Sequence, residues 1–313
     1  MLLVAACWAM HRELAGLHPR DVLAQLEGYG WRHAALGLAT AAASFVVLGL
    51  IELTALRRAT TGEPRKVVPR RAAMLTAFVA NAVSQSVGLA LLTGAAIRQR
   101  AYARYGLDAG AVARATGLVT LATTLGLVAA SAGALLASTE PLHVHGAIVS
   151  VRPLGGVLAL LVLTYLVWSI VGHSKTLGRG RWSLPTLPFR QSSRQLALSV
   201  LDWLLTATVL FAFVPAALGL GFWSVLRAYM IAQVIGVTSH VPAGAGVLEF
   251  VLLALLAGAA PAAARAAVVA SLVMFRVVYY LVPLVAAMIV AAVSEFRAPA
   301  PLLPAFREGV GAR

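Results

Sequence analysis

Five ionisable side chains lie inside long apolar segments of the sequence, and these residues are the best placed to do chemistry. They are Glu52, Asp202, Arg227, Glu249 and Arg276. A charge near the centre of a membrane helix costs at least about 2.5–3.5 kcal/mol, so each needs an oppositely charged partner or a wet cavity. Such residues usually mark binding sites or pathways through a membrane.

Arg276 is the deepest of the cations, because it lies near the middle of the apolar run 262–293, ahead of Tyr280. Its planar guanidinium suits a phosphate or a carboxylate, which it can bind through two parallel hydrogen bonds. A functional interpretation makes Arg276 the contact for an anionic ligand. A structural interpretation makes it half of an ion pair with Glu249 or Asp202. The two interpretations are compatible.

Glu249 ends the short sequence Pro-Ala-Gly-Ala-Gly-Val-Leu-Glu at residues 242–249. Gly244 and Gly246 allow the backbone to approach a ligand, and the free N–H groups at the following helix start can bind an anion. A carboxylate in the first turns of a helix also compensates the helix dipole. A ligand-facing role and a purely structural role therefore stay open for Glu249.

Three further charges lie nearer to the ends of their segments. Glu52 is one turn from the predicted cytoplasmic end of its helix and can pair with Arg57 or Arg58. Asp202 is close enough to the start of its segment for a surface role. Arg98 directly follows a segment with a polar centre, and is either an ordinary cytoplasmic charge or a contact for a lipid headgroup.

The elements that position these residues are long apolar helices. The chain is 60% hydrophobic and 12% charged, whereas a soluble domain is nearer half apolar and a quarter charged. Several runs approach or exceed the roughly 20 residues that a helix needs to cross a bilayer. No polar stretch is long enough for a soluble domain, so we expect one integral membrane domain over residues 1–313. The apolar runs are 1–10, 31–56, 72–97, 109–138, 154–172, 195–218, 222–240, 247–257 and 262–293.

Charge and motif content exclude several classes of function. The net charge is +14, but the 25 Lys and Arg residues cluster in loops between apolar runs, as topology and anionic lipid headgroups require. We therefore expect no nucleic acid as a partner. Cys7 is the only cysteine, His143 and His145 lack further ligands, and neither a phosphate-binding loop nor a nucleophile–base set is present. We expect no enzyme activity, no cofactor and no metal.

Positive charge also predicts how the chain crosses the membrane. The basic loops 57–71 and 173–194 should both be cytoplasmic, yet three complete crossings between them would place them on opposite sides. Segment 72–97, with a polar centre that includes Asn81, is therefore expected to enter from the cytoplasm and return as a re-entrant hairpin. Irregular backbone at membrane depth must be buried in protein or line a wet cavity.

A second hairpin of opposite orientation is expected from runs 222–240 and 247–257, with its tip at 242–246. The chain is thus predicted to be an all-α polytopic protein of the cytoplasmic membrane, with about six spans, two re-entrant hairpins and both termini cytoplasmic. Oppositely oriented broken helices are typical of secondary transporters. We expect the tips at 84–88 and 242–246 to approach each other near the bilayer midplane. In the alternative layout every long run spans, which leaves the basic residues after 97 outside.

Three sequence motifs lie in or beside the segments described above. The first is Asn-Ala-Val-Ser-Gln-Ser-Val-Gly at 81–88, continued by Leu-Thr-Gly-Ala-Ala-Ile-Arg at 92–98. The second is the glycine-containing run at 242–249, and the third is Phe-Arg-Val-Val-Tyr-Tyr-Leu-Val-Pro at 275–283. Together they resemble the membrane flippase domain of lysylphosphatidylglycerol synthases and its stand-alone relatives. The resemblance covers nearly the whole chain, and Glu52 stands where the family usually has an aspartate.

The resemblance implies translocation of aminoacylated or related phospholipids from the inner to the outer leaflet. It also implies that Glu52, Arg98, Glu249 and Arg276 lie near the lipid path. The synthases carry a soluble domain that makes the aminoacyl lipid; this sequence has none up to Arg313, so synthase activity is not expected. The full set of candidate lipid-contacting residues is Glu52, Asn81, Arg98, Asp202, Gly244, Gly246, Glu249, Arg276 and Tyr280.

A different class of function stays open beside transport. The chain could be an accessory membrane protein that binds lipid or a partner protein and moves nothing. The lipid, the direction, the energy source and the oligomeric state, including a homo-oligomer, are not predicted by the sequence.

Overall fold

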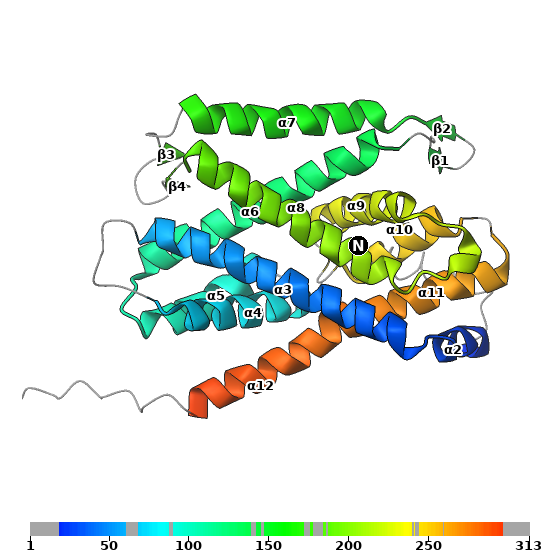
Figure 1. Cartoon of the computed structure of the whole chain (residues 1–313), viewed down its shortest axis with the longest axis horizontal. Helices are drawn as coiled ribbons and strands as arrows, with labels where there is room; N and C mark the ends of the chain where they lie inside the picture. Colours follow the sequence, from blue (N-terminus) through cyan, green and yellow to red (C-terminus); the bar gives the residue numbers. More distant parts are fainter. Residues whose placement is uncertain are drawn as a thin grey trace, which may run out of the picture.

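The chain folds as a bundle of helices, shown in Figure 1 for the computed structural model. In the part of the chain that the structure describes, four very short strands form two antiparallel ribbons: β1 (Leu142–Val144) pairs with β2 (Ala147–Val149), and β3 (Thr176–Leu177) with β4 (Leu184–Pro185). The structure describes residues 19–60, 68–87, 90–138, 142–144, 147–171, 176–177, 184–185, 187–239, 241, 244–258 and 260–296.

Within these residues, five helical segments are long and apolar enough to cross a membrane. Four are single helices and the fifth is the run Ala262–Val293. The single ones are α3 (Trp31–Ala59), α6 (Ala109–Leu136), α7 (Arg152–Val171) and α8 (Phe189–Phe211). The predicted all-α polytopic membrane fold is thereby confirmed. The sixth expected span, near residues 1–10, lies outside the described part of the chain.

Two pairs of shorter helices occupy the positions of the expected hairpins. In one pair α4 (Arg70–Val87) packs on α5 (Ala90–Ala103), and in the other α9 (Phe222–Thr238) packs on α10 (Val247–Leu256). Figure 1 shows the first pair entering from the left, where α12 (Val282–Phe296) ends, and the second from the right, where α2 (Pro19–Glu27) lies. The two pairs therefore point in opposite directions within the bundle. Their depth in a membrane stays a prediction.

The last long helix is interrupted by a π-helical turn. It consists of α11 (Ala262–Arg276), the turn η4 (Val277–Leu281) and α12 (Val282–Phe296), and the N–H of Val282 bonds to the carbonyl of Val277. Pro283 lacks the N–H that would bond to the carbonyl of Tyr279 in a regular α-helix. The loss of this hydrogen bond favours a local change such as the π turn. α10 packs on α11, while α4 packs on η4 and α12. Both helix pairs thus contact this one helix, on either side of its π turn.

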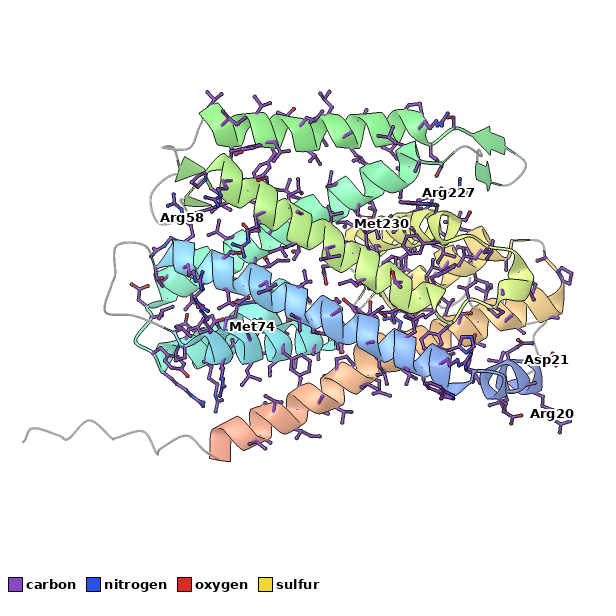
Figure 2. All side chains as sticks on the ribbon, in the orientation of Figure 1. Arg20, Asp21, Arg58, Met74, Arg227 and Met230 are labelled. Carbon is purple, nitrogen blue, oxygen red and sulfur yellow. The ribbon has the colours of Figure 1, made fainter. Side chains whose placement is uncertain are left out.

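Small residues allow the central helices to pack closely. α3 packs against α8, α4 and α6. A Cβ added at Gly49 of α3 would lie 2.5 Å from Sδ of Met74, which Figure 2 shows on α4. A Cβ at Gly126 of α6 would overlap with that of Ser199 on α8. Close backbone approach through small residues is typical of helix contacts within membranes.

Three features differ from the expectation. The nine-residue helix α2 (Pro19–Glu27) was not expected, because it is too short and polar to stand out by apolar length. α8 begins at Phe189 and ends at Phe211, whereas the apolar run predicted 195 and 218. Pro188 directly precedes its first turn and Pro215 follows its end, and prolines at these places limit the helix. The expected approach of the tips at 84–88 and 242–246 depends on Gly88, Pro242 and Ala243, which lie outside the described residues.

Candidate functional site

Glu52 and Arg98 form a buried ion pair between α3 and α5. Arg98 Nε donates to both carboxylate oxygens at 3.0 and 2.9 Å, and Nη2 donates to Oε2 at 2.8 Å. The hydroxyl of Tyr102 donates to Oε1 at 2.8 Å. The two charged side chains are 0% and 5% exposed. This pair is therefore fully hydrogen-bonded and closed to its surroundings.

The expected pairing of Glu52 with Arg57 or Arg58 is wrong. Those residues are five and six positions further along α3, whereas side chains three or four apart are neighbours on a helix. Arg98 reaches Glu52 because Gly94 leaves space for it: a Cβ at Gly94 would lie 2.8 Å from Nη1 of Arg98 and 2.9 Å from Oγ of Ser84. The resembling motifs at 81–88 and 92–98 thus form the packing that holds this pair.

Glu249 and Arg276 form a second pair, between α10 and α11. Arg276 Nε donates to Oε1 of Glu249 at 2.5 Å, while Oε2 accepts from the backbone N–H of Gly246 at 2.8 Å. The ring of Tyr280 lies 4.6 Å from the guanidinium carbon. The side chains of Arg276 and Glu249 are 23% and 21% exposed. Arg276 is thus paired with Glu249, the first of its two expected partners, and the pair is partly open.

The loop before α10 depends on glycine. Gly244 and Gly246 have φ angles of +59° and +81°, a region that side chains with a Cβ rarely adopt. Gly246 in this conformation directs its N–H at Glu249. Glu249 therefore caps its helix and pairs with Arg276 at the same time, one carboxylate oxygen serving each role.

Asp202 is buried at the contact of α8, α3 and η4, being 6% exposed. Ser44 Oγ donates to its Oδ1 at 2.5 Å, and the hydroxyl of Tyr279 lies 3.1 Å from Ser44 Oγ and 2.9 Å from Thr206 Oγ1. A surface role for Asp202 is therefore wrong. The rotation of α8 places residue 202 on the face that packs against α3.

The remaining predicted residues lie apart from these three groups. Asn81 is half-buried, and its Nδ2 donates to the carbonyl of Ala77 within α4 at 2.8 Å, not to either ion pair. Arg227 is partly exposed on α9 (Figure 2). Among the described residues, no group of three or more His, Cys, Asp or Glu is placed to hold a metal ion.

Sequence reasoning missed the hydroxyl groups around the acids. Ser44, Tyr102, Thr206 and Tyr279 were not predicted as site residues, although each hydrogen-bonds within a group that contains Glu52 or Asp202. The sequence held a partial signal for Ser44. It is a polar residue eight positions before Glu52, so the two side chains lie close to the same face of one helix.

Comparison with known proteins shows distant relatives that are membrane proteins. No protein-family model matches the sequence. An uncharacterised protein of Synechocystis is 35% identical over 215 residues, 67% of this chain and 65% of that protein. The inner membrane protein YbhN of Escherichia coli is 27% identical over 224 residues, 70% of this chain and 68% of YbhN.

Enzymes named phosphatidylglycerol lysyltransferase are also similar. That of Staphylococcus aureus is 24% identical over 297 residues, which are 93% of this chain and 33% of the enzyme. The chain therefore spans about two thirds of the first two relatives and a third of the lysyltransferase. It is distantly homologous to these proteins over most of its length. Together with the five apolar helices, they indicate a multi-pass protein of the cell membrane.

Proposed function

We propose that the protein moves an anionic or aminoacylated phospholipid between the leaflets of the cytoplasmic membrane and carries out no chemical reaction. The observation that carries this proposal is the Glu249–Arg276 pair. Its side chains are about a fifth exposed, on helices α10 and α11, whose only other charged residue is Arg265. An arginine that is accessible at membrane depth can meet the phosphate of a lipid.

The pair can exchange its acid for a phosphate without leaving a charge uncompensated. At rest, Glu249 neutralises Arg276 through a single Nε contact. The bond from Gly246 N–H fixes the other carboxylate oxygen, so Glu249 keeps its place when Arg276 turns to a phosphate. The ring of Tyr280 supports the guanidinium plane. Two parallel bonds from that plane to a phosphate give both affinity and orientation.

The helices around the pair favour movement rather than static binding. Arg276 is the last residue before the π turn, and π turns inside α-helices are frequent at functional sites. We propose that α4–α5 and α9–α10 are re-entrant hairpins of opposite orientation, as in secondary transporters. Since both contact the helix that carries Arg276, a shift at the turn can open the pair to one leaflet and then the other.

The relatives support a lipid as the ligand. The distant relative over nearly the whole chain is named for its action on phosphatidylglycerol. That name belongs to the larger enzyme, of which this chain matches a third. We extend to this chain only the lipid class, an anionic phospholipid or its aminoacyl derivative, and not the synthesis of it.

Reconstituted liposomes test the proposal. Purified protein is incorporated with fluorescent phosphatidylglycerol, its lysyl derivative or a neutral glycolipid without phosphate, and a membrane-impermeant quencher reports which leaflet holds the label. We expect the two phospholipids to exchange faster than in protein-free liposomes, and the glycolipid to exchange at the protein-free rate. If all three stay at the protein-free rate, transport is excluded and an accessory role is favoured. Equal acceleration of all three would exclude a phosphate contact.

A further inference from the structure

Asp202 differs from the other two acids within the membrane segments. Glu52 and Glu249 each bind an arginine, whereas Asp202 has no basic partner among the residues that the structure describes. It lies on α8, and the titratable groups of the packed helices that interact with it are the hydroxyls of Tyr229 on α9 and Tyr279 on η4. A lone carboxylate so enclosed is costly unless it takes up a proton.

Polar side chains lead from one end of α8 to this carboxyl. Residues 195, 199, 202 and 206 follow the spacing of one helix face, and all four are buried. Nε2 of Gln195 and Oγ of Ser199 have no hydrogen-bond partner among the described residues. A cavity of about 10 Å³ beside Gln195 is lined mostly by leucines, with Tyr165 and Ser192 as its other polar side chains. Its volume is close to the roughly 10–15 Å³ that one water needs. Nε2 of Gln195 and Oγ of Ser199 can each bond a water, and water bound between them and Asp202 would relay a proton along this face of α8.

The hydroxyl groups around Asp202 fit both the charged and the neutral acid. When Asp202 is ionised, Ser44 donates to it. When Asp202 is protonated, it can donate to Ser44 Oγ, which then donates to the hydroxyl of Tyr279, and this in turn to Thr206 Oγ1. Thr206 can finally donate to the carbonyl of Asp202 at 2.9 Å. The chain of hydroxyls therefore reverses its direction without losing a partner.

We propose that Asp202 is a proton-binding site, reached along α8 from its Phe189 end, and that its protonation is coupled to lipid movement. One proton from water neutralises the carboxylate, and the same proton returns to water when it leaves. Tyr279 carries the change to the π turn, three residues after Arg276. The coupling rests on the proposed lipid movement, but the binding of the proton does not.

Infrared spectroscopy of the whole protein tests the proton site directly. We expect the unmodified protein to show the carbonyl band of a buried protonated carboxylic acid, at higher wavenumber than the bands of its solvent-exposed acids, and this band should appear and disappear with pH. Asp202→Asn should lose that band, because an amide resembles the protonated acid in shape but cannot titrate. Asp21→Asn, at an exposed position of α2 (Figure 2), is the matched control and should retain it. The same titrating band in Asp202→Asn would overturn the site.

Liposomes with an imposed pH gradient test the coupling. A gradient of about one pH unit should change the rate of lipid movement by up to about tenfold in the unmodified protein. Asp202→Asn should move lipid at a rate that does not depend on the pH gradient. An Asp202→Asn protein whose rate still changes with the gradient would overturn the coupling. Replacing Na⁺ by K⁺ should change nothing; a Na⁺ requirement lost in Asp202→Asn would make the site a cation site. If the unmodified protein moves no lipid, the proposed function and the coupling fail, while the infrared result stands.

Discussion

The two glutamate–arginine pairs use the same residue types in opposite ways. Around Glu52 and Arg98, three guanidinium bonds and one tyrosine hydroxyl occupy the carboxylate, and both side chains are at most 5% exposed. Around Glu249 and Arg276, one guanidinium nitrogen bonds to one oxygen, and more than a fifth of each side chain is exposed. We propose that the enclosure of a pair, not its composition, separates a structural contact from a ligand-binding one.

The difference follows from the helices that carry each pair. The Glu52–Arg98 pair lies between α3 and the α4–α5 hairpin, where Gly94 lets the guanidinium fit below Ser84. The Glu249–Arg276 pair lies at the start of a ten-residue helix and at the edge of a π turn. We therefore propose that Arg98 holds the hairpin on α3 and that Arg276 contacts the lipid.

The largest expected effect on stability is at the enclosed pair. Arg98→Ala leaves Glu52 buried without a cation, which should cost about 3–5 kcal/mol. Arg276→Ala should cost less, about 1–3 kcal/mol. Solvent or lipid headgroups can reach Glu249, and the backbone N–H of Gly246 still donates to its carboxylate. The unfolding midpoints of both variants in detergent measure the difference. Equal losses would contradict the distinction between the pairs.

A smaller difference is expected between the tyrosines of the two pairs. Tyr102→Phe removes the hydroxyl that donates to Glu52, and a hydrogen bond to a charged group contributes about 1.5–3 kcal/mol. Tyr280→Phe keeps the ring that faces Arg276 and removes a hydroxyl that interacts with the neutral amide of Gln233, so it should cost less, about 0.5–1.5 kcal/mol. The same detergent unfolding assay compares them, and an equally harmful or more harmful Tyr280→Phe would contradict this ranking.

An effect no larger than that of Tyr102→Phe is expected at the loop of the open pair. Gly246→Ala must adopt a φ of +81° and a ψ of −40°, a sparsely populated conformation that should cost about 1–3 kcal/mol. Gly133→Ala is the matched control, since it lies within α6 and a Cβ there meets nothing within 4 Å; this change should be neutral or stabilising. A Gly246→Ala protein as stable as the Gly133→Ala protein would mean that the loop readily takes another conformation.

Part of the site could be predicted from the sequence, because opposite charges within apolar helices must find each other. Arg276 had two possible partners, and Glu249 was one of them. The partner of Glu52 was not predicted, since it depends on α5 crossing α3, and a sequence does not show which faces of two helices meet. The environment of Asp202 was not predicted for the same reason, because Ser44 and Tyr279 reach it from separate helices.

The fold could be predicted further than the site. Apolar length predicted the long helices, whereas the basic loops, the polar centre of 72–97 and the break at 242–246 predicted the positions of both helix pairs. The predicted ends of α8 differ from the observed ones, since the observed ends depend on Pro188 and Pro215 and not on apolar length. Helix α2 was not predicted because it has nine residues and is polar. It is stabilised by its contact with α11, and no local sequence pattern reveals that contact.

The most direct test compares Arg276→Lys with Arg98→Lys in the liposome assay, with the exposed Arg32→Lys as the control. Lysine keeps the charge but loses the planar fork. We expect Arg276→Lys to fold normally and to move phosphatidylglycerol about tenfold more slowly, as loss of about 1.4 kcal/mol would give. Folded Arg98→Lys should unfold at lower temperature yet move lipid at nearly the Arg32→Lys rate. The account would be contradicted by an Arg276→Lys protein as fast as the control, or by an Arg98→Lys protein that is stable but slow.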